Sequence, residues 1–338
     1  MYEALLKNTP EYQKTAASLA SPGPAALFGL PPAGRALLYA ALQKDTGRIL
    51  CVVTPGEAEA THFADDLKTL GLSAAVFPPR DFMLRPVEGA GREYEYRRLS
   101  VLGALAGGRL NAVCVPAEAL LQYTVPQDEF QKNTLTLKPG MVYNREALVE
   151  RLFAAGYVRR SQVDGPGQFS VRGDIVDIYA PNMRQPARVE YWDDEIDSLA
   201  SQRRDGALEK IYLSPAREVL FGSTADTAEA LRAAQKKARG KRRTALEKAM
   251  ESDLAQLDSG VMPEAMDKYY GLRYETPATL LDHLSSPIFI LDEVGGIRDA
   301  QKATEFRRSE ELTGLLEEGV ICPGLDVLYQ TMDDLTIA

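Results

Sequence analysis

Apolar and polar positions along the 338-residue chain follow two kinds of pattern, and the first of them fills the opening third. Near-continuous apolar runs at residues 48–54, 74–77 and 112–115 indicate strands that are buried on both faces of a parallel sheet. Segments with helical periodicity separate these runs, at residues 57–70 and 96–106. Because strands and helices alternate, we predict a doubly wound α/β domain with a mostly parallel sheet.

The second pattern is a short-period alternation in residues 167–199, which predicts a small sheet of strands joined by turns. The first strand alternates apolar and polar residues around Phe169, and further strands follow at residues 175–178 and 188–192. Gly173 lies at the first turn, where glycine permits a positive φ angle. This small α+β domain is expected to be inserted into the larger one, because sheet material resumes later in the chain.

The two patterns divide the chain into three stretches. We expect residues 1–122 to be the first part of the α/β domain, residues 123–214 to be the inserted α+β domain, and residues 215–338 to hold a helical segment and the rest of the α/β domain. The remaining predicted elements are helices at residues 1–20, 37–43, 145–154, 224–257 and 305–318, and strands at residues 25–28, 130–137, 210–213, 288–291 and 320–328.

A frame for phosphate binding lies near the amino terminus, where the predicted strand at residues 25–28 is followed by Gly29, four residues, Gly34 and a helix. A working phosphate-binding loop needs Lys next, to reach the phosphates, and then Ser or Thr, to hold Mg²⁺. This chain has Arg35 and Ala36 instead, and two prolines remove N–H donors from the loop. The frame therefore predicts a loop that has lost nucleotide chemistry.

A second nucleotide-site signal is the apolar strand at residues 288–291, which ends in Asp292 and Glu293. In nucleotide hydrolases such an Asp holds Mg²⁺, although many core strands also end in acids. Together with the altered loop, it indicates a relic. We predict a vestigial nucleotide site without hydrolysis or bound cofactor, formed by Gly29, Gly34, Arg35, Asp292 and Glu293.

Composition narrows the functional classes. The formal net charge of −9 argues against a protein whose main task is to hold duplex DNA. Cys51, Cys114 and Cys322 are far apart, and with two histidines they give no metal-ligand spacing. No signal-peptide pattern or membrane-length apolar run occurs. We expect a cytoplasmic monomer with reduced thiols and no metal.

A basic cluster interrupts the predicted helices at residues 224–257. It could bind phosphate, or it could be a solvated helix face that is balanced by Glu247, Glu251 and Asp253. The second interpretation is the simpler one, because charge runs usually lie on the surface. The cluster consists of Lys236, Lys237, Arg239, Lys241, Arg242 and Arg243.

The small predicted sheet has the composition of a docking surface. It carries Arg172, Arg188 and Trp192, the only tryptophan of the chain, beside an acidic run. Arg and Trp are enriched among the residues that dominate binding energy at protein interfaces. The pattern alone is also compatible with an ordinary half-solvated sheet with scattered ion pairs.

The same stretch carries a long sequence motif that resembles the second domain of bacterial transcription-repair coupling factors. It also resembles the homologous domain of the excision-repair protein UvrB. The matching positions are Gly167, Phe169, Arg172, Gly173, Ile175, Asp177, Ile178, Tyr179, Pro181 and then Arg188 to Ser198.

The resemblance implies that this domain recruits the damage sensor UvrA, a role that outweighs the ordinary-sheet interpretation. It implies that the arginines pair with UvrA carboxylates, that Trp192 supplies apolar area or orients the arginines, and that the acids meet basic residues. The implied contact residues are Arg172, Arg188, Glu190, Tyr191, Trp192, Asp193, Asp194 and Glu195.

The resemblance further implies an incomplete chain. In the family, modules that bind RNA polymerase and translocate on DNA with ATP follow this region. The main alternative is a nucleotide-dependent DNA enzyme of the UvrB or helicase type. Arg35 and Ala36 argue against it, as does the space between residues 77 and 96, which is too short for the DNA-clamping hairpin of UvrB.

Overall fold

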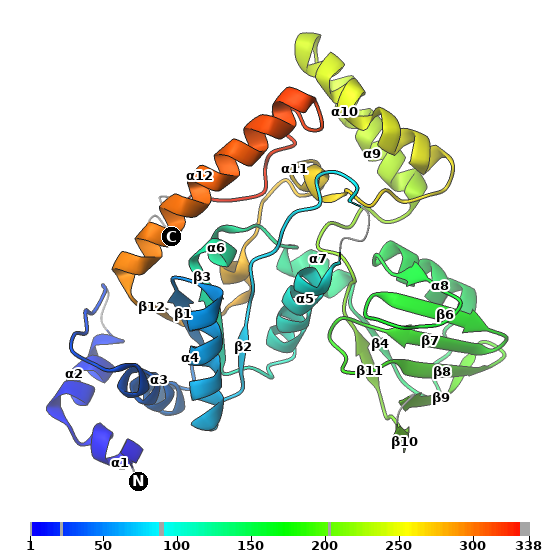
Figure 1. Ribbon diagram of the computed structural model, residues 1–338. Coiled ribbons are helices and arrows are strands. Elements are labelled where there is room, and N and C mark those ends of the chain that lie inside the picture. Colours follow the sequence, from blue (N-terminus) through cyan, green and yellow to red (C-terminus); the bar gives the residue numbers. More distant parts are fainter. Residues whose placement is uncertain (1, 21–22, 88–90, 202–203, 332–338) are drawn as a thin grey trace. The chain divides into compact units, whose positions relative to one another are not determined.

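The computed structural model describes residues 2–20, 23–87, 91–201 and 204–331 (Figure 1). Its backbone contacts divide the chain into two compact units. The first unit comprises Met1–Pro79, Ala104–Leu120 and His283–Thr304, and the second comprises Arg80–Gly103, Leu121–Asp282 and Glu305–Ala338.

The first unit contains a four-stranded sheet whose strands are all parallel, in the order β12-β1-β3-β2. Its strands are β1 (Leu50–Thr54), β2 (Ala74–Val76), β3 (Ala112–Pro116) and β12 (Ile288–Leu291). Every residue of β1 and β3 is buried, as expected for central strands that are covered on both faces. The predicted α/β class is confirmed, with the sheet in this unit and a separate small sheet in the other.

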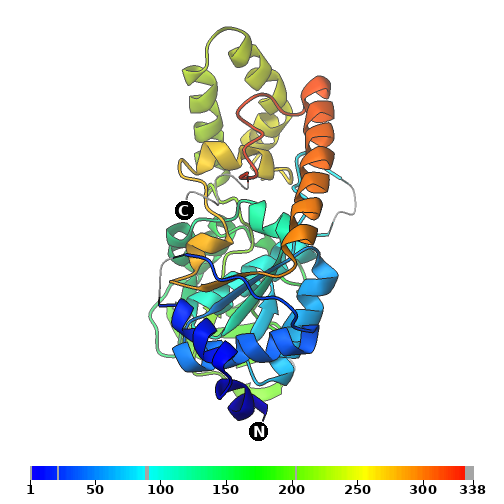
Figure 2. The same cartoon turned by 90° about the vertical axis from the view of Figure 1, so that its left-hand side faces the viewer.

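Helices α3 (Pro32–Thr46) and α4 (Glu57–Thr69) share one apolar core with the sheet (Figure 2). Leu67 of α4 packs in this core with Leu50 and Val52 of β1, and each of the three side chains is fully buried. Burying one such side chain contributes roughly 1.5–3 kcal/mol. The other helices of this part of the chain are α1 (Tyr2–Lys7), α2 (Pro10–Ser18) and α6 (Ala117–Leu121).

Two predictions near the amino terminus are wrong. The expected strand at residues 25–28 is irregular chain, and its Phe28 side chain is 90% exposed. These four apolar residues, which precede a left-handed Gly29 (φ 79°), pair with no strand in the described part of the chain and so gain no ladder hydrogen bonds. The single helix expected at residues 1–20 is two helices, because the Thr9 hydroxyl caps a new helix that begins at Pro10.

The second unit contains a six-stranded sheet in the order β10-β9-β8-β7-β6-β5, antiparallel except for the β5–β6 pair. Three of these strands, β6, β7 and β8, agree with the prediction, whereas β5, β9 and β10 are not predicted. β9 begins inside the acidic run, at Glu195, so its pattern does not stand out. The strands are β5 (Val158–Arg159), β6 (Gln168–Arg172), β7 (Ile175–Tyr179), β8 (Ala187–Trp192), β9 (Glu195–Ser201) and β10 (Arg204–Ala207).

Two-residue turns set the register of this sheet. Gly173 lies in the turn that pairs Arg172 with Ile175, and its φ of 59° confirms the predicted positive angle. The other turn pairs Trp192 with Glu195. One face of the sheet packs against α8 (Arg145–Ala154) in a second apolar core, so side chains that alternate along each strand point either to this core or away from it.

Replacing Gly167 with Ala should destabilise the second unit more than replacing Gly173 with Ala. Both glycines have positive φ angles, 75° and 59°, which cost a non-glycine residue about 1–2 kcal/mol. At Gly167 a Cβ would also lie 2.6 Å from the Tyr96 hydroxyl oxygen and 2.9 Å from its ring carbon, whereas nothing lies within 4 Å at Gly173. Urea denaturation of both variants measures the difference, and equal losses would contradict this packing.

The rest of the second unit is largely helical. The strand predicted at residues 130–137 is instead a helix followed by a short strand, and residues 320–328 form no named strand. The helices and turns here are α7 (Gln127–Lys132), α9 (Thr224–Lys237), α10 (Gly240–Asp258), η1 (Asp267–Tyr269), α11 (Tyr270–Arg273) and η2 (Leu280–His283). Strands β4 (Leu135–Leu137) and β11 (Ile211–Leu213) form a two-stranded sheet, and α5 (Glu93–Ala106) and α12 (Val294–Glu318) have residues in both units.

A fully buried arginine in α5 holds both ends of the segment that carries the small sheet. The Arg98 guanidinium donates to Glu218 Oε1 at 2.7 Å, to Gln122 Oε1 at 2.8 Å and to the Tyr123 carbonyl at 3.1 Å. Gln122 and Tyr123 precede the segment and Glu218 follows it, so one side chain joins its entry to its exit. Burial lowers the pKa of Arg98, and the Glu218 carboxylate opposes that shift.

Arg80 extends this buried network to η1. Its two terminal nitrogens bond both carboxylate oxygens of Asp267, at 2.7 and 3.0 Å, and its Nε donates to Glu218 at 3.3 Å. Burial opposes the charge of Arg80, but the two carboxylates outweigh it and raise its pKa. The buried acids are therefore compensated, which charges inside a protein require.

Candidate functional site

The candidate site is the face of the small sheet that points away from its apolar core. Along β8, Ala187, Val189 and Tyr191 enter that core, whereas Arg188 and Glu190 point the other way. Pairing across β6, β7, β8 and β9 forms two rows on this face. We call it the outer face, and its rows are Ser170, Asp177, Arg188 and Ala200, and Arg172, Ile175, Glu190 and Ser198.

Arg188 is held in place by an acid from the neighbouring strand. Its Nε donates to Asp177 Oδ1 at 2.9 Å, and its Nη2 donates to Asp177 Oδ2 at 3.2 Å. Asp177 is only 2% exposed, while the Arg188 side chain keeps 36% exposure. The hydrogen bonds to Asp177 raise the pKa of Arg188. The acid thus orients a guanidinium that solvent, or another protein, can still reach.

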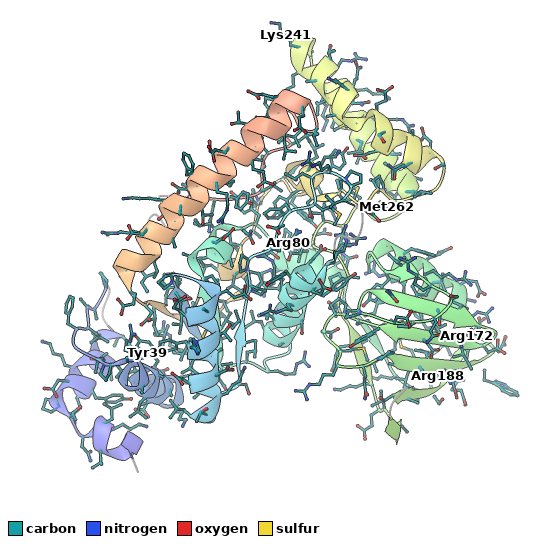
Figure 3. The ribbon with its side chains drawn as sticks, viewed as in Figure 1. Tyr39, Arg80, Arg172, Arg188, Lys241 and Met262 are labelled. Atoms are coloured by element: carbon teal, nitrogen blue, oxygen red, sulfur yellow. The ribbon has the colours of Figure 1, made fainter. Side chains whose placement is uncertain are left out.

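Arg172 is the more exposed arginine of the face. It lies at the end of β6, one row from Arg188, and its Nη2 donates to the Ser161 carbonyl at 3.0 Å. Figure 3 labels both arginines on the sheet. Glu190, in the same row as Arg172, accepts a hydrogen bond from the Ser198 hydroxyl at 2.8 Å. The face therefore presents two cations and one anchored anion.

Trp192 and the acidic turn form the margin of the outer face. Trp192 is 80% exposed, and Asp193, Asp194 and Glu195 are exposed beside it. Asp193 has a φ of 56°, in the left-handed region that Asp tolerates better than most residues. Asp194 accepts a hydrogen bond from the Asn144 amide nitrogen at 2.6 Å. A large aromatic ring left in water beside charged groups is typical of a binding surface.

Tyr191 lies in the core and is 6% exposed. Burial raises its pKa to about 12. The motif predicts a contact role for it beside Arg188 and Trp192, but the alternation of β8 places its ring among the apolar side chains behind the face. In this structure its contribution to the outer face is to support the strand.

Two residues that shape the site have no predicted role. The first is Asp177, for which the signal was a single acid inside an otherwise apolar run. The second is Val142, which is 76% exposed and forms a backbone bridge with Glu195. Val142 and Glu195 are far apart in sequence, so no local pattern could have linked them.

Three of the five residues predicted for the vestigial nucleotide site are in contact in the first unit. Arg35 lies in the first turns of α3, and its Nη1 bonds Asp292 Oδ1 at 3.0 Å and Glu293 Oε1 at 2.7 Å at the end of β12. Gly34 is inside the helix, and Gly29 lies in the irregular chain before it. The guanidinium therefore lies against both acids of the strand end, where a nucleotide hydrolase would hold Mg²⁺.

The electrostatics of this cluster fit an internal ion pair. Burial raises the pKa of Asp292, and the positive charge of Arg35 opposes that rise. Burial, together with the charge of Asp292, raises the pKa of Tyr39 to about 12. Tyr39 lies one turn after Arg35 on α3 and is itself buried, whereas the Glu293 side chain remains 65% exposed. Asp292 and Glu293 therefore form ion pairs with Arg35 of the same chain.

Elsewhere in the described ranges, no group of three or more His, Cys, Asp or Glu side chains is arranged to hold a metal ion. The three cysteines are free and buried. In the same part of the chain, no helix combines the length and apolar character needed to cross a bilayer.

Comparison with known proteins gives matches over the sheet and over most of the chain. Residues 135–218 match the family model described as the UvrB interaction domain. Over 311 residues the chain is 30% identical to the transcription-repair-coupling factor of Bacillus subtilis, covering 87% of this chain and 26% of that protein. The protein of the same name from Staphylococcus epidermidis is 26% identical over 307 residues, with 86% and 26% covered. The chain thus spans about a quarter of the length of these relatives.

Proposed function

Because the chain is homologous to the amino-terminal quarter of transcription-repair-coupling factors and contains a UvrB interaction domain, we propose that its outer face binds UvrA. The resemblance that the sequence motif indicated is confirmed. The partner is our inference from the family and from the chemistry of the face. In this proposal the chain brings UvrA to sites of stalled transcription.

The observation that carries the proposal is the Asp177–Arg188 pair. An arginine pre-oriented by a buried acid loses little side-chain entropy on binding, and its fork-shaped guanidinium suits a carboxylate. Arg172, one row away, supplies a second cation. We propose that both arginines meet acids of UvrA, that Trp192 adds apolar area, and that Glu190 with the acidic turn meets basic residues.

A mixing experiment tests the proposal. The chain and its cognate UvrA are combined and analysed by size-exclusion chromatography with light scattering. We expect a complex that elutes earlier than either protein and contains both. Two separate peaks at micromolar concentrations would reject UvrA as the partner of this chain.

The same homology leads us to propose that contacts with RNA polymerase, and translocation on DNA with ATP, belong to other parts of a longer protein. The contacts of Arg35 with Asp292 and Glu293 argue against the alternative, a nucleotide-driven enzyme in this chain. We propose that the Arg35–Asp292–Glu293 cluster preserves the scaffold of the first unit and performs no hydrolysis.

Mg-ATP should leave the melting temperature of the chain unchanged. A ligand present at about 100 times its Kd adds about 2.7 kcal/mol of stability, so binding would be visible in a thermal shift assay. We expect no shift because Arg35 already pairs with both Asp292 and Glu293 and occupies the place of the metal. Mg²⁺ without nucleotide is the control. A saturable increase that requires Mg-ATP and disappears in Asp292→Asn would contradict this assignment.

A further inference from the structure

A dense cluster of positive charge lies where α9 joins α10. Six cations occur within eight residues, in a stretch without an acid and in a chain of net charge −9. All six are exposed. Figures 1 and 2 show the two helices side by side as a hairpin, and Figure 3 shows Lys241 at the end where they join. We call this cluster the basic tip, formed by Lys236, Lys237, Arg239, Lys241, Arg242 and Arg243.

Of the acids that the sequence offered as balancing charges, one is engaged elsewhere and one pairs within the basic tip. Asp253 is buried, where it binds Lys268 at 2.8 Å and accepts a hydrogen bond from the Tyr269 hydroxyl. Glu247 pairs with Arg243 at 2.8 Å. Over the described ranges, the other five cations of the basic tip form no ion pair. Only Arg243 of the six cations is therefore paired in the way that a charge-balanced helix face requires.

The start of α10 adds to the positive potential. Arg239 at its N-cap makes no side-chain hydrogen bond to the helix, and the first turn contains no acid. The first amide N–H groups of a helix lack internal acceptors and carry a partial positive charge. At this position, the helix end and the side chains attract the same kind of ligand, an oxyanion.

The composition of the hairpin favours phosphate groups over bases. No aromatic residue occurs between Phe221 and Tyr269. Proteins that bind single-stranded nucleic acid usually stack aromatic side chains on the bases, and the hairpin cannot do so. Exposed Lys and Arg side chains without aromatic neighbours bind the sugar-phosphate backbone.

We propose that the basic tip binds the phosphate backbone of a nucleic-acid duplex without reading its sequence. The excess of acid in the rest of the chain repels a polyanion, so the tip is the point at which a duplex approaches. This contact is separate from UvrA binding by the outer face, and either can hold without the other.

Fluorescence anisotropy with a short labelled DNA duplex tests the proposal. The tip variant replaces Lys236, Lys237, Arg239 and Lys241 with Gln, which preserves helix propensity. The matched control replaces four exposed cations elsewhere, Lys14, Lys138, Arg298 and Lys302, with Gln. Both variants lose four positive charges, so only the position of the charges differs.

We expect the wild type and the control to bind the duplex within about twofold of each other, and the tip variant to bind at least about tenfold more weakly. If four to five phosphates are neutralised, raising the salt concentration from about 50 to about 200 mM should weaken wild-type binding roughly 100- to 500-fold. The tip variant should show a shallower salt dependence. Duplexes of the same length and different base sequence should bind with equal affinity.

Further arms of the experiment identify the source of the phosphate. Equal binding of an RNA duplex supports a general backbone contact, and preference for DNA assigns the contact to DNA. Equal duplex affinity of the tip variant and the control would overturn the proposal. So would a tip that prefers polyglutamate or vesicles of anionic lipid over the duplex at equal charge concentration.

Discussion

Replacing Arg172 and Arg188 together with alanine should weaken UvrA binding by about 2–5 kcal/mol, a loss of roughly 30-fold to 5,000-fold in affinity. The loss is large because acids on UvrA would remain desolvated without their partners. Calorimetric titration of UvrA into the folded variant measures it. Arg232→Ala, which removes an exposed arginine paired with Asp258 on the α9–α10 hairpin, is the control and should retain wild-type affinity.

The single variants separate binding from stability. Arg188→Ala leaves the buried Asp177 without its guanidinium and should cost about 1–3 kcal/mol of unfolding free energy. Arg172→Ala removes an exposed side chain and should change stability by at most about 0.5 kcal/mol. Adding Asp177→Asn to Arg188→Ala should recover stability but not affinity. Recovery of both would show that Arg188 acts only by holding the sheet together.

Replacing Arg98 with Met should destabilise the second unit by about 3–5 kcal/mol. Arg98 is fully buried, and its loss would leave the equally buried Glu218 with Arg80 as its remaining cation, at 3.3 Å. It would also release the entry and exit of the small-sheet segment from each other. Urea denaturation measures the change.

The matched comparison for Arg98 is an exposed ion pair in the same unit. Arg85 pairs with Glu318 at 3.1 Å, with more than half of each side chain in solvent. Arg85→Ala should therefore cost at most about 1 kcal/mol. Similar losses for Arg98→Met and Arg85→Ala would contradict the structural role assigned to the buried network.

Much of the fold follows from local sequence patterns. The buried strands of the first unit and the turn at Gly173 were predicted because periodicity and turn chemistry are local properties. The strand at residues 25–28 failed for the complementary reason, since a short apolar run does not reveal whether a neighbouring strand exists to pair with it. β9 is not predicted because it begins with the exposed acid Glu195, directly after two further acids, so the polar run conceals the start of a strand.

The sheet that carries the candidate site was predicted, and the contacts between its side chains were not. The motif placed Arg172, Arg188 and Trp192 on one sheet, but only the register of β7 against β8 brings Asp177 under Arg188. The contacts of Arg98 likewise depend on segments more than 100 residues apart, as in its bond to Glu218. No period or spacing encodes such pairs, because they form only after the chain has folded.

The central claim, that the outer face is the UvrA-binding surface, is tested most directly through Trp192. It is the only tryptophan of the chain and is 80% exposed, so fluorotryptophan labelling yields one ¹⁹F resonance from the margin of the face. On titration with unlabelled UvrA, we predict that this resonance shifts or broadens saturably, in step with complex formation followed by light scattering. A complex that forms fully while the Trp192 resonance stays unchanged would contradict the account.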